Sequence, residues 1–294
     1  MILAAIDIGS NAARLLINEV TEDQKGNPKF TKLNLLRIPL RLGIDVFSKG
    51  EIGQERKQMM IDTMQVFSQI MRIYKVEHYR ACATSAMRDA RNGQEIIAQV
   101  KETSGIQIEI ISGDEEATLI YENHIAETMD KDQSYLYIDV GGGSTELTFY
   151  DNGKLKYKRS FNIGTIRLMN NLVQEFHWKE MKEAIKEHIK GKKVIAIGSG
   201  GNINKVFSMS KTKDDKPLSV DYLKKFYKEA SALSVAQRME KYKVREDRAD
   251  VLVPALTIYN NVLDWADISE IYVPKISVAD GLIHSIYDKV KENN

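Results

Sequence analysis

The stretch Ile138-Asp139-Val140-Gly141-Gly142-Gly143-Ser144-Thr145-Glu146-Leu147 decides the fold. An apolar run that ends in an Asp and a glycine-rich turn predicts a buried strand entering a tight loop. The N-terminus repeats this pattern, because Ile6-Asp7-Ile8-Gly9 aligns with Ile138-Asp139-Val140-Gly141 and Leu15 with Leu147 at a constant offset of 132 residues. The sequence therefore predicts two related lobes.

Strands and helices alternate outward from these two motifs. Hydrophobic periodicity predicts strands at 14–19, 79–83, 107–111, 135–140 and 193–197, and helices at 54–74, 93–103 and 114–129. The polar stretch 22–29, which contains Gly and Pro, predicts a hairpin loop. This alternation indicates an α/β fold.

Composition limits the partners that the protein can have. The chain has 294 residues, with 42 Lys+Arg against 41 Asp+Glu and a formal net charge of +1. Such a balance gives no overall field towards nucleic acid or an acidic membrane surface, so we expect neither as a partner, and a polyanion must be held by local chemistry. The single Cys82 excludes an internal disulfide. With no signal-peptide pattern and no apolar run of ~20 residues, a cytoplasmic location is expected.

The two glycine-rich turns offer groups that bind phosphate. Glycines let successive backbone N–H groups curl around phosphate oxygens, Ser and Thr hydroxyls add donors, and an Asp at the strand end can hold Mg²⁺. For one copy alone, a tight hairpin with a capping Asp is an equal explanation, whereas two copies favour phosphate binding. A third turn, containing Gly200 and Gly201, is a further phosphate candidate, although a plain strand-to-helix turn explains it equally well.

Two further residues are candidates for chemistry. Ser112 and Glu115 have capping-box spacing, which gives Glu115 a structural role. Glu116 points elsewhere around the helix and is a candidate general base for water attack, although the helix dipole favours a Glu at this place in any case. Arg88 follows a predicted strand and could clamp phosphate, or could pair with Asp89 at the surface.

These motifs, in this order, resemble those of the exopolyphosphatase/guanosine pentaphosphate phosphohydrolase (Ppx/GppA) family of the actin, sugar kinase and Hsp70 superfamily. The resemblance covers nearly the whole chain and rests on residues 5–16, 83–92, 111–117, 138–147, 160–168 and 197–202. It implies an α/β fold of two ribonuclease-H-like (actin-like ATPase) lobes with a cleft between them. The expected lobes are residues 1–127, joined by a C-terminal helix in 278–294, and residues 128–277.

The resemblance also implies roles for individual residues. Glu116 matches the catalytic base, and Arg88 and Arg14 are expected to assist catalysis. The residues expected to bind phosphate are Ser10, Asn11, Gly141, Gly142, Gly143, Ser144, Thr145, Gly200 and Gly201. The metal is expected at Asp139 and Glu146, with Asp7 assisting. Mg²⁺ is the expected cofactor, with a monovalent cation such as K⁺ as a candidate second one.

The activity that the resemblance implies is Mg²⁺-dependent hydrolysis of the terminal phosphate of inorganic polyphosphate. Two departures are visible: Ala12 stands where the family usually has Ser, and the chain ends at Asn294 without the C-terminal helical domains of longer members, so short polyphosphate chains are favoured. Guanosine pentaphosphate 5′-phosphohydrolase, an activity of the stringent response, is the alternative. A phosphotransferase and a non-enzymatic, nucleotide-gated actin-like module are further alternatives, and a homodimer is a candidate assembly.

Overall fold

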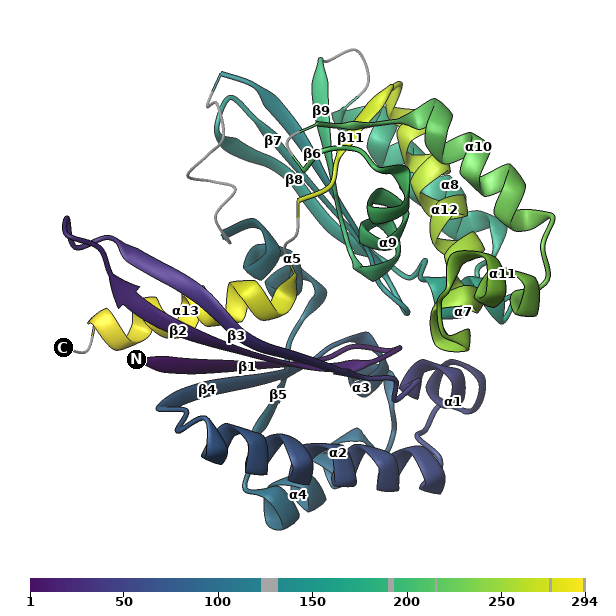
Figure 1. The fold of residues 1–294 in the computed structure, drawn as a ribbon. Helices are drawn as coiled ribbons and strands as arrows, with labels where there is room; N and C mark the ends of the chain where they lie inside the picture. Colours follow the sequence, from purple (N-terminus) through teal and green to yellow (C-terminus); the bar gives the residue numbers. More distant parts are fainter. Residues whose placement is uncertain (123–131, 190–192, 215, 275–276, 293–294) are drawn as a thin grey trace. The chain divides into compact units, whose positions relative to one another are not determined.

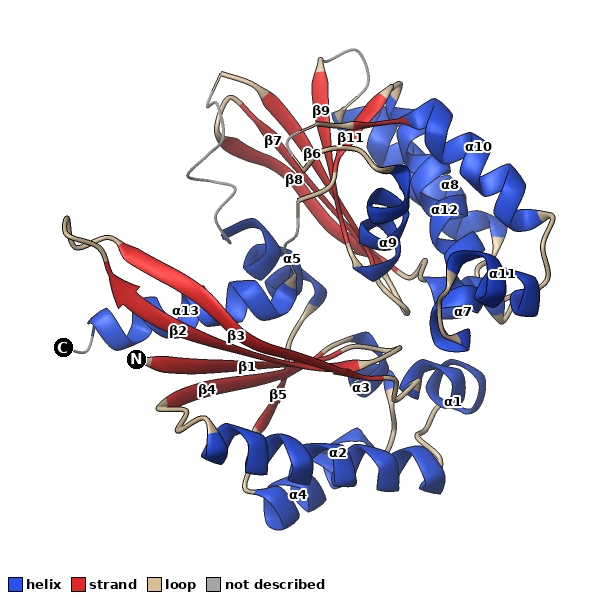
Figure 2. Cartoon of the chain, viewed as in Figure 1, coloured by secondary structure: helices blue, strands red, loops and turns tan. Residues whose placement is uncertain are grey.

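The structure, a computed structural model, describes residues 1–122, 132–189, 193–214, 216–274 and 277–292. The chain divides into two compact units, Met1–Asn123 with Ser277–Asn294 (unit 1) and His124–Ile276 (unit 2). Each unit contains a β-sheet with helices packed on it (Figures 1 and 2). The α/β class predicted from the alternation is therefore confirmed. In the described part of the chain, no helix combines the length and apolar character needed to cross a bilayer.

Unit 1 is built on a five-stranded sheet in the order β3-β2-β1-β4-β5. Its strands are β1 (Ile2–Ile8), β2 (Ala13–Glu22), β3 (Pro28–Ile38), β4 (His78–Ala83) and β5 (Ile108–Ile110). Its described helices are α1 (Leu42–Lys49), α2 (Gln54–Ile73), α3 (Ser85–Asp89), α4 (Gly93–Ser104), α5 (Gly113–Glu122) and α13 (Val278–Glu292). The elements predicted in this unit are confirmed to within a few residues, except that residues 123–129 of the predicted helix 114–129 lie outside the described residues.

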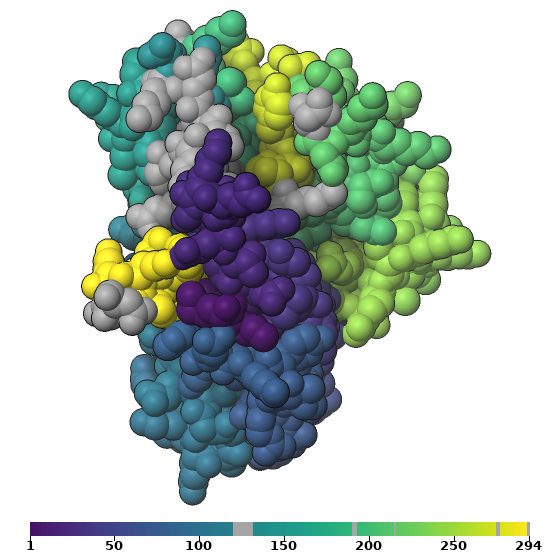
Figure 3. All heavy atoms as spheres, turned by 60° about the vertical axis from the view of Figure 1, so that its left-hand side comes forward, coloured from purple at the N-terminus to yellow at the C-terminus, as the bar shows by residue number. Residues whose placement is uncertain are grey.

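Helices cover both faces of this sheet. The helices α2 and α4 lie on one face, and α2 buries Met60, Met64, Phe67 and Met71 at helical spacing, as its sequence period requires. On the other face, α13 packs against β1, β2, β4 and α5. Figure 3 shows α13, in yellow, lying beside the N-terminal strands in purple.

Unit 2 is built on a six-stranded sheet in the order β10-β11-β9-β6-β7-β8. Its strands are β6 (Ser134–Val140), β7 (Thr145–Asp151), β8 (Lys154–Phe161), β9 (Val194–Ser199), β10 (Leu218–Ser219) and β11 (Glu270–Tyr272). Its described helices are α7 (Thr165–Met169), α8 (Glu175–His188), α9 (Gly201–Ser210), α10 (Val220–Ser231), α11 (Val235–Tyr242) and α12 (Glu246–Ala266).

The internal repeat is confirmed in the topology of the two sheets. Three strands that meander in antiparallel order are followed by a short helix in both units, as β1-β2-β3-α1 and as β6-β7-β8-α7. The strand order β3-β2-β1-β4 in unit 1 corresponds to β8-β7-β6-β9 in unit 2. The register repeats as well, because Asp7 faces Arg14 across the strand pair as Asp139 faces Glu146.

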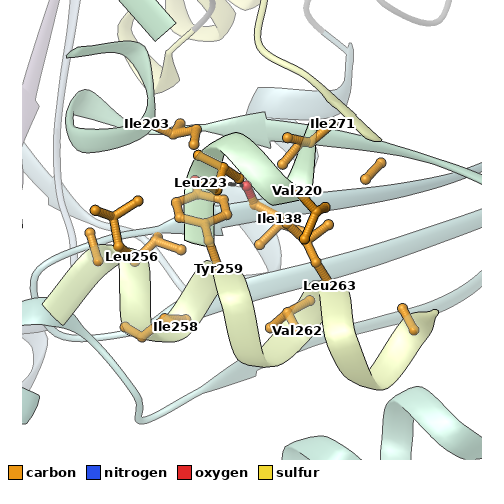
Figure 4. Close-up of a cluster of buried hydrophobic side chains, with 14 of the residues drawn as sticks. Ile138, Ile203, Val220, Leu223, Leu256, Ile258, Tyr259, Val262, Leu263 and Ile271 are labelled. Atoms are coloured by element: carbon orange, nitrogen blue, oxygen red, sulfur yellow. Dashed lines mark hydrogen bonds between the residues drawn. The ribbon is translucent and has the colours of Figure 1, made fainter. Parts of the chain in front are cut away.

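A buried side chain of α12 bonds the central strands β6 and β9 of unit 2 near their carboxyl ends. Tyr259 on this helix is 1% exposed, and its hydroxyl donates to the carbonyl oxygen of Ile138 at 3.3 Å (Figure 4). The same hydroxyl donates to the carbonyl oxygen of Ser199. Burial raises the pKa of this hydroxyl well above its ordinary value, and the nearby charge of Asp139 acts in the same direction. Tyr259 therefore remains a neutral donor that ties β6 and β9 to α12.

Candidate phosphate and metal site

The candidate residues stand at corresponding edges of the two sheets. In unit 1, β1, β4 and β5 run parallel, and in unit 2, β6, β9 and β11 run parallel. Ligands of open α/β sheets bind outside the carboxyl ends of such strands. Each glycine-rich turn predicted to bind phosphate follows one of these carboxyl ends, after Ile8, Val140 or Ser199.

Two acidic residues of unit 2 lie directly opposite each other on neighbouring strands. Asp139 on β6 is the register partner of Glu146 on β7, and carboxylate oxygens of the two residues lie within 4.8 Å of one another. Glu146 is 2% exposed. The Ser199 hydroxyl donates to Asp139 Oδ1 at 2.6 Å, and the Ser160 hydroxyl donates to Glu146 Oε1 at 2.7 Å.

This pair fits a divalent cation. Like charges directly opposite each other on a strand pair are destabilising, and here one of the two carboxylates is buried. A cation between them would remove that repulsion. The donor set consists of carboxylate oxygens, which are the hard ligands that Mg²⁺ prefers.

The glycine-rich turn of unit 2 is fixed by the start of α7. The Gly141 carbonyl accepts from the Thr165 amide at 3.0 Å, and the Gly142 carbonyl accepts from the Ile166 amide at 2.8 Å. The Gly143 carbonyl accepts from Arg167 Nε at 2.8 Å. In a trans peptide the C=O and the next N–H point in opposite directions. The amides of residues 142, 143 and 144 therefore point away from α7, as a phosphate-binding loop requires.

A close approach holds this turn against α7. A Cβ on Gly164 would lie 2.5 Å from both Gly142 O and Ser144 N. The Thr145 side chain belongs to the same contact: it is fully buried, and its hydroxyl donates to the Ile163 carbonyl at 2.5 Å. The hydroxyl proton of Thr145 is thus used inside the unit, and binding of phosphate by this residue stays a prediction.

The third glycine-rich turn lies beside the acidic pair. The strand before this turn was predicted to end at residue 197, whereas β9 continues to Ser199 and α9 begins at Gly201. Gly200 has a φ of 114°, which an L side chain rarely adopts, and a Cβ there would lie 3.3 Å from Asp139 Oδ1. The backbone at Gly200 can therefore pass close to the carboxylate of Asp139.

In unit 1 the corresponding turn is held in the same way. The Gly9 amide donates to Ala12 O at 3.0 Å, as the Gly141 amide donates to Ser144 O at 2.9 Å. The carbonyls of Ser10 and Asn11 accept from amides at the start of α1, namely those of residues 43 and 41. By the same peptide geometry, the amides that follow these carbonyls point away from α1.

The side chains of the unit 1 turn contact the neighbouring strands. Arg14 Nη1 donates to Asp7 Oδ2 at 2.6 Å, and Asp7 is only 3% exposed. The hydroxyls of Ser10 and Ser85 are 2.8 Å apart and buried. The structure thus brings together Asp7 and Arg14 in one pair, and places Ser10 beside the start of α3.

The two remaining candidates of unit 1 lie around the loop after β5. Arg88 Nη1 donates to the Ile111 carbonyl at 2.9 Å. The Ser112 hydroxyl accepts from the Glu115 amide at 3.0 Å, which is one half of the predicted capping box. The Glu115 carboxylate, predicted to reach back to the helix start, accepts from Arg80 Nη2 at 2.6 Å. Glu116, one residue further, is 8% exposed. The adjacent glutamates therefore have different surroundings, with Glu116 the more buried.

Sequence reasoning gave no role to Ser160, Ser199, Gly164 or Tyr259. Ser160 and Ser199 face the acidic residues only through strand register, which joins segments far apart in the chain. Gly164 and Tyr259 act through tertiary contacts. The one signal available in the sequence was that β9 and β8, the neighbours of the two strands carrying Asp139 and Glu146, each have a serine at or next to their last residue.

The sheet order, the repeat and the paired turns define a protein of the actin-like ATPase fold, and solved structures agree. An exopolyphosphatase from Cytophaga hutchinsonii is similar over 98% of both chains, with 25% identity and a TM-score of 0.84. A Ppx/GppA family member from Aquifex aeolicus is similar over 100% of this chain and 99% of its own, with 24% identity and a TM-score of 0.76. The model of the Ppx/GppA phosphatase family matches residues 20–290. The chain belongs to that family.

Two curated relatives are longer than this chain. A bifunctional 3-dehydroquinate synthase/phosphatase of Fusobacterium nucleatum is 32% identical over 200 residues, which make up 64% of this chain and 30% of the relative. A guanosine-5′-triphosphate,3′-diphosphate pyrophosphatase of Vibrio parahaemolyticus is 22% identical over 305 residues, 99% of this chain and 60% of the relative. This chain thus spans less than two thirds of either relative.

Proposed function

We propose that this protein hydrolyses the terminal phosphoanhydride bond of inorganic polyphosphate in a Mg²⁺-dependent reaction, with short chains as preferred substrates. One observation carries the proposal: a turn with outward-pointing amides stands beside two opposed carboxylates, Asp139 and Glu146, at the carboxyl edge of the unit 2 sheet. The similarity to the Cytophaga exopolyphosphatase over almost the full length of both chains supports polyphosphate as the substrate.

In this proposal Asp139 and Glu146 would hold Mg²⁺, with Asp7 assisting. Bound there, Mg²⁺ would neutralise charge on the phosphate oxygens. The amides of the glycine-rich turns and the guanidinium groups of Arg14 and Arg88 bind the phosphoryl oxygens. A guanidinium carries five N–H donors, so the bonds from Arg14 to Asp7 and from Arg88 to Ile111 leave donors for phosphate.

Glu116 is the proposed general base. Its carboxylate accepts a proton from water while the water oxygen attacks the terminal phosphorus in line, and the bridging P–O bond breaks to release orthophosphate and the shortened chain. Removing the carboxylate charge by Glu116→Gln should lower kcat by ~10²–10⁴-fold with little change in substrate binding, since general-base catalysis contributes on this scale.

Glu115→Gln is the matched control. It makes the same chemical change one residue earlier, at a half-exposed carboxylate paired with Arg80, where the ion pair contributes at most ~1 kcal/mol. Kinetics of phosphate release compare the two variants. Near-normal turnover of Glu116→Gln would remove Glu116 from the mechanism.

The substrate is tested by measuring orthophosphate release from short polyphosphate, long polyphosphate and guanosine pentaphosphate side by side, with Mg²⁺ and with EDTA. We expect the highest kcat/KM on short polyphosphate and none with EDTA. Guanosine pentaphosphate is the second candidate, because the Vibrio relative matches 99% of this chain. A higher kcat/KM on guanosine pentaphosphate than on short polyphosphate would make the nucleotide the proposed substrate.

Two control experiments distinguish the proposed hydrolase from a phosphotransferase and from a non-enzymatic actin-like module. ADP-dependent loss of polyphosphate without orthophosphate release would indicate a phosphotransferase. Nucleotide-dependent growth in light scattering, without phosphate release, would indicate an actin-like polymer or binding module. The same light-scattering measurement gives the mass of the particle and so tests the candidate homodimer.

A further inference from the structure

Four polar residues stand in register across four adjacent strands of unit 2. Ser199 on β9 is the partner of Asp139 on β6, Asp139 is the partner of Glu146 on β7, and Glu146 is the partner of Ser160 on β8. Residues opposite each other in a sheet project from the same face. We call these four residues the acidic row: two carboxylates in the centre, with one serine on each outer side.

Each serine bonds the carboxylate next to it. The Ser199 hydroxyl donates to Asp139 Oδ1 at 2.6 Å, and the Ser160 hydroxyl donates to Glu146 Oε1 at 2.7 Å. These lengths are those of charge-assisted O–H···O⁻ bonds, which are about twice as strong as neutral ones. Both bonds come from the outer side of the row, so each holds its carboxylate at one named oxygen.

The bonds limit how the carboxylates can turn. A carboxylate offers about four lone-pair sites on its two oxygens, so one hydroxyl bond fixes the rotation of the group and leaves capacity for a cation. Partners of this kind behind a metal ligand orient it, and their removal commonly lowers metal affinity ~10–100-fold.

Ser199 is itself held in place from the core. Its backbone carbonyl accepts a hydrogen bond from the buried Tyr259 hydroxyl, and its side chain is nearly inaccessible. The hydroxyl that donates to Asp139 therefore sits on a strand end that α12 supports. This support makes Ser199 a rigid donor.

We propose that Ser199 and Ser160 are positioning residues, which hold Asp139 and Glu146 in the orientation that binds the divalent cation. The proposal rests on the function proposed above, since it takes this carboxylate pair as the metal site. In this proposal neither serine contacts the substrate.

The test is direct measurement of Mn²⁺ binding to the full chain by electron paramagnetic resonance, without substrate, together with the Mg²⁺ concentration that gives half-maximal phosphate release. Ser199→Ala and Ser160→Ala should each weaken Mn²⁺ binding and raise the half-maximal Mg²⁺ concentration ~10-fold, while kcat at saturating Mg²⁺ stays near the wild-type value. Ser160→Thr keeps the hydroxyl in a residue that suits strands, so it should restore Mn²⁺ affinity.

Ser134→Ala is the matched control. Ser134 donates to Asp151 Oδ1 at 2.7 Å, and this serine–carboxylate pair is in register at the opposite end of the same β6–β7 pair. It loses the same kind of bond away from the acidic row, so Mn²⁺ affinity should not change. Thermal melting of all variants separates a loss of folding from a loss of metal affinity.

The outcomes distinguish this inference from the proposed function. If wild-type protein releases phosphate and both alanine variants bind Mn²⁺ as it does, the inference is wrong and the function stands. If no substrate is hydrolysed but both alanine variants weaken Mn²⁺ binding and Ser134→Ala does not, the positioning role stands and the function is wrong. Wild-type protein that binds no Mn²⁺ overturns the inference, as does a loss of affinity in Ser134→Ala equal to that in Ser160→Ala.

Discussion

Replacing Gly164 by Ala should damage catalysis more than stability. Gly164 has φ −134° and ψ 164°, an extended backbone that any residue adopts, so the effect of Gly164→Ala comes from space alone. The new Cβ would meet the Gly143 carbonyl carbon at 2.4 Å, and Gly142 O and Ser144 N at 2.5 Å. Ordinary contact begins at 3.4 Å, so the glycine-rich turn must retreat from α7 by about 1.0 Å.

The size of the effect follows from that displacement. Forcing a methyl group into a packed contact costs ~1–3 kcal/mol of folding free energy, which lowers the melting temperature by several degrees. A shift of ~1 Å in groups that position a substrate lowers the rate ~100-fold. We therefore expect kcat/KM for short polyphosphate to fall ~100-fold in a protein that is still folded at 25 °C.

The assay is steady-state phosphate release, with the melting temperature measured in parallel. Gly105→Ala is the control, because Gly105 has a left-handed φ of 74° and nothing within 4 Å of the added Cβ, so alanine there costs stability through backbone strain alone. Wild-type kcat/KM in Gly164→Ala would refute the role of this contact. So would an equal loss in Gly105→Ala.

Two other groups give predictions that depend on burial. Tyr259→Phe removes a buried donor to two carbonyls and should cost ~1 kcal/mol, a fall of ~2–4 °C in the melting temperature of a unit of this size; an unchanged melting curve would contradict the hydrogen bonds described. Burial raises the pKa of Cys82 to about 12, so native protein at pH 8 should react with iodoacetamide far more slowly than protein unfolded in urea, and equal rates would contradict the burial. Because the unfolded thiol loses its proton near its ordinary pKa of 9.0 and the folded one does not, the stability contributed by Cys82 should decline as pH rises above 9, as denaturant titrations at pH 8 and pH 10 can measure.

The sequence was sufficient for the fold class and for the elements around the two repeated motifs, because these depend on local patterns. The methionine stripe of α2 fixes that helix within one residue of its observed end, and the aligned Asp7 and Asp139 motifs mark the first strand and turn of each unit. The same local reasoning explains why Glu115 and Glu116 could be separated, since helix geometry alone places consecutive residues on different sides.

Features that depend on strand register could not be predicted in this way. The predicted strand ends at residue 197, but the pairing of Ser199 with Asp139 extends β9 by two residues beyond it. Ser160 and Gly164 lay within a recognised motif without a role, because their partners Glu146 and Gly142 belong to another part of the chain. Hydrogen bonds and close approaches between distant segments leave no periodic signal in a sequence.

The repeat also places side chains of opposite charge at equivalent register positions of the two sheets. The register row of unit 1 that corresponds to the acidic row consists of Arg37 on β3, Arg14 on β2, Asp7 on β1 and Cys82 on β4. It carries two guanidiniums and one carboxylate, whereas the acidic row carries two carboxylates and no cation. Two equivalent positions account for this difference, because Arg14 corresponds to Glu146 and Arg37 corresponds to Ser160. A chain with a net charge of only +1 can thus present one row of net positive charge and one of net negative charge, which the proposed function needs for a polyanion and for its cation.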